Sequence, residues 1–297
     1  MGYSLNRHCS AVEPVLIGTG ANGKSTFLRV LQHLLGDYAG TIPMQGLMEQ
    51  RYGSQTNDLA HLFGKRFVVA SEGERGHRLA ESKIKMMTGG DRIACRPLYK
   101  DLFEYVPEFK LWLATNDLPT ISGMDEAIWR RIRVIEFPIT IPPEQQDKGL
   151  ADRLISELAG ILQWAMQGCL EWRKIGLAPP ASVGQSTQKY RDDNNSVGQW
   201  IESACSLDLK LRTSVKDLHD SYAAWCDSSG LEPLPGSLFG KELTRLGFEI
   251  VKSKKGNGRL GIGLKEPPAS TGTFANKRSM SLPVHPCAPS GAKQWLN

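Results

Sequence analysis

The pattern of apolar and polar positions predicts an α/β domain in the first half of the chain. Four short apolar runs, at residues 15–17, 67–70, 109–114 and 132–137, have the length and the flanking turn residues of buried β-strands. Strands that alternate with helices are typical of a parallel sheet flanked by helices. After the first run, large apolar side chains recur at helical spacing; they are Phe27, Leu28, Val30, Leu31, Leu34 and Leu35.

The same pattern divides the chain into two folded units. Helical spacing recurs from residue 150 to 172, so the α/β domain is expected to span 15–178, after a 1–14 remnant of an upstream region. Two prolines followed by Ser, Gly and Gln predict a linker at 179–196. Three helices and then two strands are expected within 197–266, which is the order of a small winged-helix domain. Residues 267–297 are mainly small and polar, and are predicted to be a disordered tail.

Composition limits the classes of protein that fit. Of the 297 residues, 40% are hydrophobic and 23% are charged, and no apolar run reaches the ~18 residues that a membrane span needs. The N-terminus lacks the apolar segment of a signal peptide. The six cysteines are scattered without a C-x-x-C pair, which favours reduced thiols in a cytoplasm over disulfides or a zinc site. A net charge of +5 permits a polyanionic partner without requiring one.

One segment carries the pattern of a phosphate-binding loop, G-x-x-x-x-G-K-[ST]. Its residues are Gly18, Thr19, Gly20, Ala21, Asn22, Gly23, Lys24, Ser25 and Thr26. The glycines let backbone N–H groups curve around an anion, the lysine reaches the β- and γ-phosphates, and the serine hydroxyl holds Mg²⁺. A predicted strand precedes the loop and a predicted helix follows it, which is the context that the motif requires. The sequence therefore predicts a site for ATP and Mg²⁺.

Polar residues after the second and third predicted strands are candidates for hydrolysis. A carboxylate from Glu72 or Glu74 can take a proton from the attacking water, and Glu72 can hold Mg²⁺ together with Ser25. Asn116 ends the third strand, where its amide can contact the γ-phosphate or orient the water. Taken without the loop, the two acids also fit a solvated strand end, and the asparagine fits a turn.

Arg130 and Arg131 lie where a predicted helix changes to a strand. An arginine in such a place can reach the nucleotide of a neighbouring subunit and stabilise charge on the transferred phosphoryl group. From residue type alone, a basic surface patch is an equal alternative.

These elements, in this order, resemble the superfamily 3 helicases, which are AAA+ ATPases of viruses, phages and plasmids. The resemblance is to the C-terminal helicase half of phage and plasmid primase-helicases, which are related to the poxvirus primase-helicase. It covers residues 15–140 and rests on GTGANGKSTFL, RFVVASEGE, KIKMMTGGDRIACRPLYKDLFEYVPEFKLWLATNDLP and DEAIWRRIRVIEFP. The roles that it implies are Walker A for Lys24 and Ser25, Walker B for Glu72 and Glu74, sensor 1 for Asn116, and an arginine finger for Arg130 or Arg131.

The resemblance also implies an assembly and partners. Members of this family form homo-hexameric rings that move along single-stranded DNA and unwind duplexes. Other replication proteins are expected partners, and the expected location is the cytoplasm of a bacterial host that carries the phage or plasmid.

Residues 93–106 predict a β-hairpin with a basic tip at Lys100. In the family, a hairpin before sensor 1 projects into the ring channel and contacts the DNA backbone, which implies Lys100 as the phosphate contact. A lysine meets a phosphate as a point charge without sequence preference. The alternative is a solvated turn lysine. Weaker candidates are Lys83, Lys85, Arg92 and Arg96.

Basic residues are concentrated at the end of the second unit. From Lys241 to Lys265, seven Lys or Arg residues stand against two acids, Glu242 and Glu249. Positive charge gathered on one helix and hairpin indicates nucleic-acid binding, and the segment resembles the winged-helix domain that follows the ATPase in primase-helicases. A charged surface hairpin without a ligand, or a wing that binds protein, is the alternative. The candidate DNA contacts are Lys241, Arg245, Lys254, Lys255 and Arg259.

Together these features predict an ATP-driven DNA helicase motor that acts on single-stranded or forked DNA. One alternative is an AAA+ initiator-type ATPase that melts or remodels DNA without processive unwinding. The other is an inactive fragment that retains only DNA binding, because family members carry a helical collar and often a primase domain before the loop. No primase activity is expected.

Overall fold

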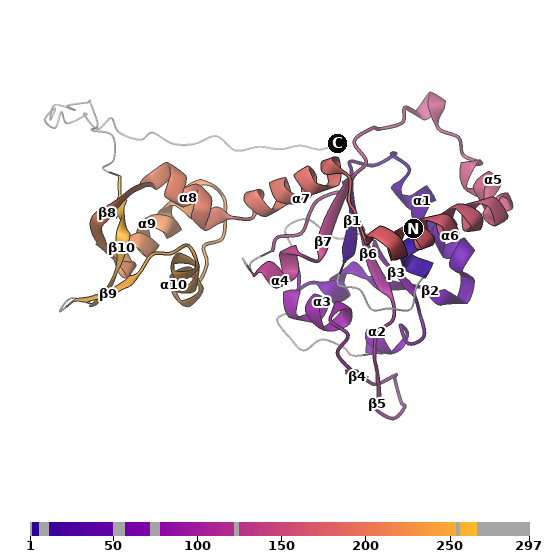
Figure 1. Ribbon diagram of the computed structural model, residues 1–297, viewed down its shortest axis with the longest axis horizontal. Helices are drawn as coiled ribbons and strands as arrows, with labels where there is room; N and C mark the ends of the chain where they lie inside the picture. The colour runs from indigo at the N-terminus through magenta and orange to yellow at the C-terminus, as the bar shows by residue number, and fades with distance from the viewer. Residues whose placement is uncertain are drawn as a thin grey trace, which may run out of the picture.

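The computed structural model describes residues 2–5, 12–49, 57–71, 78–121, 125–253 and 256–265. Figure 1 shows two bodies, with helix α7 (Ala181–Asp193) between them. Three sets of predictions lie outside the described residues: Glu72 and Glu74, the two lysines Lys254 and Lys255, and the tail at 267–297. Within the part that is described, no helix has both the length and the apolar character needed to cross a membrane.

The larger body is built on a five-stranded parallel sheet with the strand order β2-β3-β6-β1-β7. Four of the strands are those that the apolar runs predict, which confirms the α/β class and the parallel sheet. The sequence does not predict the fifth, β2, because Ile42 is its only buried residue and a glycine and a proline weaken its strand pattern. The strands are β1 Glu13–Ile17, β2 Ala39–Pro43, β3 Phe67–Ser71, β6 Lys110–Thr115 and β7 Ile132–Glu136.

Helices cover both faces of this sheet (Figure 1). Successive side chains of β1 point to opposite faces, so Val15 belongs to one core and Leu16 to the other. Leu16 packs with α1 (Lys24–Leu35), on the face where α6 (Leu158–Ile175) and the short helix η1 (Gly2–Leu5) also lie. The core of Val15 contains side chains of η3 (Met44–Leu47), α2 (Asn57–Ala60), α3 (Glu81–Thr88) and α4 (Glu126–Trp129). Shorter elements at the margin are η2 (Gly36–Tyr38), η4 (Pro143–Gln145) and α5 (Leu150–Ser156).

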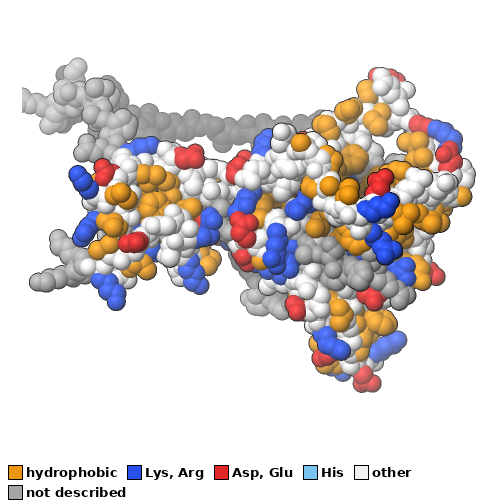
Figure 2. Space-filling model, in the orientation of Figure 1, with side chains coloured by type: hydrophobic (Ala, Val, Ile, Leu, Met, Phe, Trp, Pro, Cys, Tyr) orange, Lys and Arg blue, Asp and Glu red, His pale blue; other side chains and the backbone are white. Residues whose placement is uncertain are grey.

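The predicted hairpin is present between α3 and β6. Strands β4 (Ile93–Cys95) and β5 (Phe103–Tyr105) pair antiparallel, with Ile93 opposite Tyr105. The hairpin extends away from the sheet in Figure 1, and Figure 2 shows hydrophobic, basic and acidic side chains on this projection.

The C-terminal body contains the three helices and two strands that the sequence predicts, together with one further strand. Its core is aromatic, because Trp200, Tyr222 and Phe239 pack with their ring centroids 5.0–5.8 Å apart. The additional strand β8 pairs with β10 in a sheet of order β8-β10-β9. Apolar residues do alternate with polar ones along β8, at Leu207, Leu209 and Leu211, so the strand signal is present in the sequence and sequence reasoning missed it. The elements are α8 Ser196–Ala204, β8 Cys205–Ser214, α9 Val215–Ser228, α10 Gly236–Arg245, β9 Ile250–Ser253 and β10 Gly256–Leu264.

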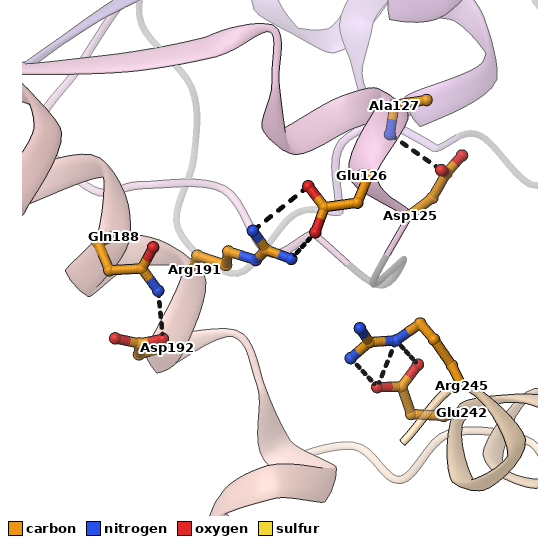
Figure 3. A network of polar contacts seen from close by, with 8 residues as sticks. All are labelled: Asp125, Glu126, Ala127, Gln188, Arg191, Asp192, Glu242 and Arg245. Carbon is orange, nitrogen blue, oxygen red and sulfur yellow. Dashed lines mark hydrogen bonds and ion pairs between the residues drawn. The ribbon is translucent and has the colours of Figure 1, made fainter. Parts of the chain in front are cut away.

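The predicted linker at 179–196 contains a helix that is fixed to the sheet. In α7, Thr187 Oγ1 accepts a hydrogen bond of 3.0 Å from Val134 N, and Tyr190 is buried with its hydroxyl donating to Pro119 O. Arg191 pairs with Glu126 of α4, as Figure 3 shows. The polar composition of this segment predicts a break, but a few anchoring side chains are enough to hold it as a packed helix.

Candidate nucleotide site

The predicted phosphate-binding loop joins the carboxyl end of β1 to the first turn of α1. The backbone has positive φ at Gly20 (108°), Ala21 (46°) and Gly23 (87°), a region that glycine enters readily and other residues rarely. Gly23 precedes α1 and has no side chain to cap it, and Asn22 Oδ1 accepts only a long hydrogen bond of 3.5 Å from Lys24 N. The first backbone N–H groups of α1 therefore face the loop without helical acceptors, as an anion site requires.

The segment after β7 supports the loop. Asn22 Nδ2 donates to Phe137 O at 3.2 Å, and Ile141 N donates to Ala21 O at 2.8 Å. A Cβ atom added to Gly18 would lie 2.4 Å from Phe137 O, so this position requires glycine. Sequence reasoning missed this support, because nothing in the residues after β7 indicates contact with a loop 115 residues earlier.

The structure brings two of the predicted site residues together, Lys24 and Asn116. Strand β6 lies beside β1, so the end of β6 and the loop share the carboxyl edge of the sheet. Lys24 Nζ donates to Asn116 Oδ1 at 3.2 Å and to Asn22 Oδ1 at 3.4 Å. It also donates to the carbonyl oxygen of Gly18. All of these acceptors are neutral oxygens.

The donors around the loop fit a triphosphate and a hard cation. Lys24 is 6% exposed, and burial lowers the pKa of its ammonium group because the charged form loses hydration. Ser25 is exposed and Thr26 is half-buried. A cation, a hydroxyl and helix amides at one point are the groups that hold phosphate oxygens and Mg²⁺ in loops of this type.

The acids predicted to act in hydrolysis, Glu72 and Glu74, are outside the described residues. Strand β3, which precedes them, ends at Ser71 and pairs with β6, so it ends at the same edge of the sheet as the loop. Their role stays a prediction.

The two candidate finger arginines have different environments. Arg131 is 6% exposed, its Nε donates to Thr88 Oγ1 at 3.0 Å, and its Nη1 donates to Ala127 O. Its guanidinium is therefore held inside its own domain and is not available to a neighbouring subunit. Arg130 is exposed at the end of α4. Of the two arginines only Arg130 has an exposed side chain, and its role as an arginine finger stays a prediction.

A buried carboxyl group lies beside Arg131, and sequence reasoning missed it. Glu13 begins β1 and is 0% exposed. Desolvation raises the pKa of Glu13 to about 8, against the opposing effects of the Arg131 charge and the Thr88 hydroxyl. This cluster lies at the amino end of β1, opposite the loop. Its only sequence signal is an acid before an apolar run, which a solvated strand end shares.

The hairpin tip presents the predicted DNA contacts to solvent. Lys100 and Arg92 are exposed, and Arg96 Nε donates to Lys100 O at 2.8 Å, so it helps to shape the turn. Tyr99 is 96% exposed at φ 60°, so the turn presents an aromatic ring to solvent next to Lys100. Lys85 is less available, because it pairs with Asp125 at 2.6 Å.

The basic residues of the C-terminal body also differ in availability. Lys241 is exposed. Arg245 forms a bidentate pair with Glu242, its Nε and Nη2 lying 2.6–3.1 Å from the two carboxylate oxygens (Figure 3). Arg259 is buried and donates to Thr244 Oγ1 at 2.8 Å. Of the described candidates here, Lys241 is the one placed for direct contact with an external partner.

Two families match successive parts of the chain. Residues 16–131 match a family described as a family of unknown function, DUF5906. Residues 192–260 match a family described as poxvirus D5 protein-like. The first match contains the loop, the hairpin and Asn116, and the second contains most of the C-terminal body.

Relatives of known name come from large DNA viruses. The chain is 29% identical over 238 residues to "Putative helicase L207/L206" of Acanthamoeba polyphaga mimivirus, covering 72% of this chain and 25% of the relative. It is 28% identical over 233 residues to "Putative helicase 022R" of Frog virus 3 (isolate Goorha), covering 71% and 24%. The chain thus spans about a quarter of the length of these relatives.

A solved structure shares the fold. The apo C-terminal region of NrS-1 has a TM-score of 0.52 and 11% sequence identity, covering 88% of this chain and 69% of that one. The sheet and the loop define an α/β protein with a P-loop-type motif. With the D5-like match and the viral relatives, the chain resembles the helicase half of D5-like primase-helicases, as the sequence predicts.

Proposed function

We propose that the chain is an ATP-dependent DNA helicase motor that acts in replication. It binds a nucleoside triphosphate at the loop, hydrolyses it at the interfaces between subunits of a homo-hexameric AAA+ ring, and moves along single-stranded DNA. The putative-helicase names of its viral relatives support this proposal, although the chain spans only part of them.

The contact between Lys24 and Asn116 is the observation that carries this function. The ammonium group is held at the N-terminus of α1 by neutral oxygens only, among the described residues. A phosphate bears more negative charge than a carbonyl or amide oxygen and forms a stronger, charge-assisted hydrogen bond. A γ-phosphate would therefore take the ammonium group from these acceptors, and Asn116 would be free to orient a water molecule.

Ser25 and Glu72 are the residues proposed to hold Mg²⁺, which neutralises phosphate charge when it is bound. Glu72 or Glu74 would take the proton of the attacking water. Arg130 would reach the nucleotide of the adjacent subunit, because it is exposed at the end of a helix that Arg191 and Glu126 fix in place. In other NTPases such an arginine contributes roughly 10³–10⁵ in rate.

Two surfaces are proposed to contact DNA. The exposed tip of the β4–β5 hairpin offers Lys100 to the backbone in the ring channel. The C-terminal body, proposed to act as a winged helix, presents Lys241 on α10.

The decisive experiment measures ATP hydrolysis with and without single-stranded DNA, and then strand displacement on forked DNA. A motor gives DNA-stimulated hydrolysis and displacement. Hydrolysis without displacement contradicts the motor and supports an initiator-type ATPase. DNA binding without hydrolysis supports a fragment that only binds. Light scattering with ATP and DNA tests the ring, since a persistent monomer contradicts hydrolysis at subunit interfaces.

The hairpin role has its own test. Lys100→Ala is expected to retain ATP hydrolysis and to reduce strand displacement, because the side chain that contacts the DNA backbone loses its positive charge. Lys189→Ala is the matched control, because Lys189 is an exposed lysine of α7 that no part of the proposed site uses. Equal displacement by the two variants would reject the role of Lys100.

A further inference from the structure

A hollow of about 520 Å³ lies in the C-terminal body between the start of α9, the exposed side of α10 and the β9–β10 pair. Figure 1 shows these elements together, and Figure 2 shows Lys and Arg side chains around the edges of the same body. Lys216 comes from the first turn of α9, Lys241 from α10 and Arg259 from β10.

The hollow is positively charged and has no acid in its wall. Three of its lining residues are cations, and none of the described lining residues is a carboxylate. The nearest acid of α10, Glu242, is 7% exposed and is bound by Arg245. Lys216 and Lys241 are exposed at the rim, so their ammonium groups can reach a ligand without displacing a partner that the structure records.

Arg259 makes the wall of the hollow unusual. It is 4% exposed, and its guanidinium donates to Thr244 Oγ1 at 2.8 Å, to Phe248 O at 2.9 Å and to Gly240 O. Its Nε is buried without a hydrogen-bond partner among the described residues. Burial lowers the pKa of the Arg259 guanidinium, because desolvation disfavours its charge. A buried cation that faces only neutral acceptors is stabilised by an anion placed beside it.

The start of α10 adds backbone donors. Helix α10 has ten residues and begins at Gly236 after Pro235, which provides no side-chain cap. Gly236 and Ser237 both line the hollow. The first N–H groups of a helix have no helical acceptor and lie at the positive end of its dipole, which favours a negatively charged group there.

We propose that this hollow seats one phosphate group of a nucleic-acid backbone, with Lys216 and Lys241 above it and Arg259 and the α10 amides below. The proposal rests on the proposed function in taking nucleic acid as the partner. A phosphate contact of this kind fixes the position of the C-terminal body on the strand and reads no base. The sequence predicts Arg259 to be a DNA contact on the surface. In this proposal Arg259 is instead a buried charge that forms part of the phosphate site.

The test uses Lys216→Ala, Lys241→Ala and the double variant in the full chain. Binding to a duplex oligonucleotide is measured by fluorescence anisotropy across a series of salt concentrations. Each neutralised phosphate contributes about 0.9 to the slope of log affinity against log salt. Because both lysines serve one phosphate, the double variant is expected to lose about 0.9 in slope, and each single variant a large part of that loss. Two independent contacts would lose about 1.8.

The control variant is Lys210→Ala, since Lys210 is an exposed lysine of β8, at the opposite edge of the sheet from β9. It removes the same charge from the same body but does not line the hollow. Slopes of the hollow variants that equal the Lys210→Ala slope would overturn the proposal, and an additive loss in the double variant would overturn a single shared phosphate.

Inorganic phosphate is the second probe. Its titration is expected to shift the backbone amide resonances of Gly236 and Ser237 in the full chain, and less so in the double variant. Phosphate binding together with unchanged oligonucleotide binding by the variants would overturn the nucleic-acid assignment and indicate a site for a free phosphate group.

The outcome is separable from that of the motor. Lys24→Ala is expected to lose hydrolysis and to keep the salt slope, because the loop is in the other body. If the protein without substitutions shows no hydrolysis but the hollow variants have a smaller salt slope, the motor proposal fails and the phosphate site is supported. If hydrolysis is stimulated by DNA but the hollow variants have unchanged salt slopes, the motor is supported and the phosphate site is rejected.

Discussion

A basic side chain is buried near each end of strand β1, and the two differ in the groups that surround them. At the amino end, Arg131 is 6% exposed and lies beside the carboxyl group of Glu13, the hydroxyl of Thr88 and the carbonyl of Ala127. At the carboxyl end, Lys24 is equally buried but contacts only amide and carbonyl oxygens among the described residues.

The difference shows that burial of a cation does not define a binding site. Arg131 is enclosed by its own domain, with a titratable carboxyl group next to it, so an external anion has no access and little to gain. The acceptors of Lys24 are neutral, and exposed Ser25 and the open start of α1 lie beside it. A phosphate that binds at the carboxyl end therefore gives Lys24 a charged partner in place of neutral oxygens. At the amino end, a phosphate could reach Arg131 only by displacing buried side chains.

Arg131→Met is expected to lower the free energy of unfolding by about 3 kcal/mol, because it removes the two charge-assisted hydrogen bonds to Thr88 and Ala127 from a buried cluster. Urea titration measures this loss. Arg130→Ala is the control: the exposed neighbour is expected to leave stability unchanged and to reduce ATP turnover. Equal stability of the two variants would remove the distinction between the arginines.

Lys24→Ala is expected to reduce ATP turnover by about 10²–10³-fold or more, the cost of losing one donor that stabilises transition-state charge. Its free energy of unfolding should be unchanged or slightly higher, since the desolvation cost of the ammonium group disappears with the side chain. Steady-state hydrolysis and thermal melting measure the two effects. Lys65, which donates to Asp37 O at 2.8 Å, provides the control Lys65→Ala. Normal turnover in Lys24→Ala would remove the loop from the mechanism.

The sequence predicts the carboxyl end of β1 much better than the amino end. The loop is a contiguous motif whose spacing has a chemical reason, and Asn116 is predicted because it is the polar residue directly after a neighbouring strand. The position of Arg131 next to Glu13 depends on the pairing of β7 with β1, in which Glu13 lies opposite Ile132. This pairing joins segments that are far apart in the sequence, and no local pattern contains it. The same limit explains why the support from Phe137 and the helix α7 were not predicted.

The pH dependence of stability is expected to report on the amino end. The pKa of Glu13 is raised to about 8 from its ordinary value of 4.5. Between these values the unfolded chain releases a proton that the folded protein keeps, so stability falls as pH rises, by at most about 1.4 kcal/mol per pH unit. Glu13→Gln removes this titration. Urea titrations from pH 5 to pH 9 are expected to show a stability difference between the two proteins that changes with pH, and a constant difference would contradict the assignment.

Asn116→Asp tests the importance of neutral acceptors at the carboxyl end, because it places a carboxylate about 3.2 Å from Lys24 Nζ. We expect nucleotide affinity to fall roughly 10- to 100-fold, since hydrogen bonds to charged groups contribute about 1.5–3 kcal/mol and the lysine is then already paired. Titration calorimetry with MgATP measures the change. Asn116→Ala removes the same amide without adding charge, so it should bind nucleotide more tightly than Asn116→Asp. If the two variants bind equally, neutral acceptors around Lys24 are not what makes this end of β1 a phosphate site.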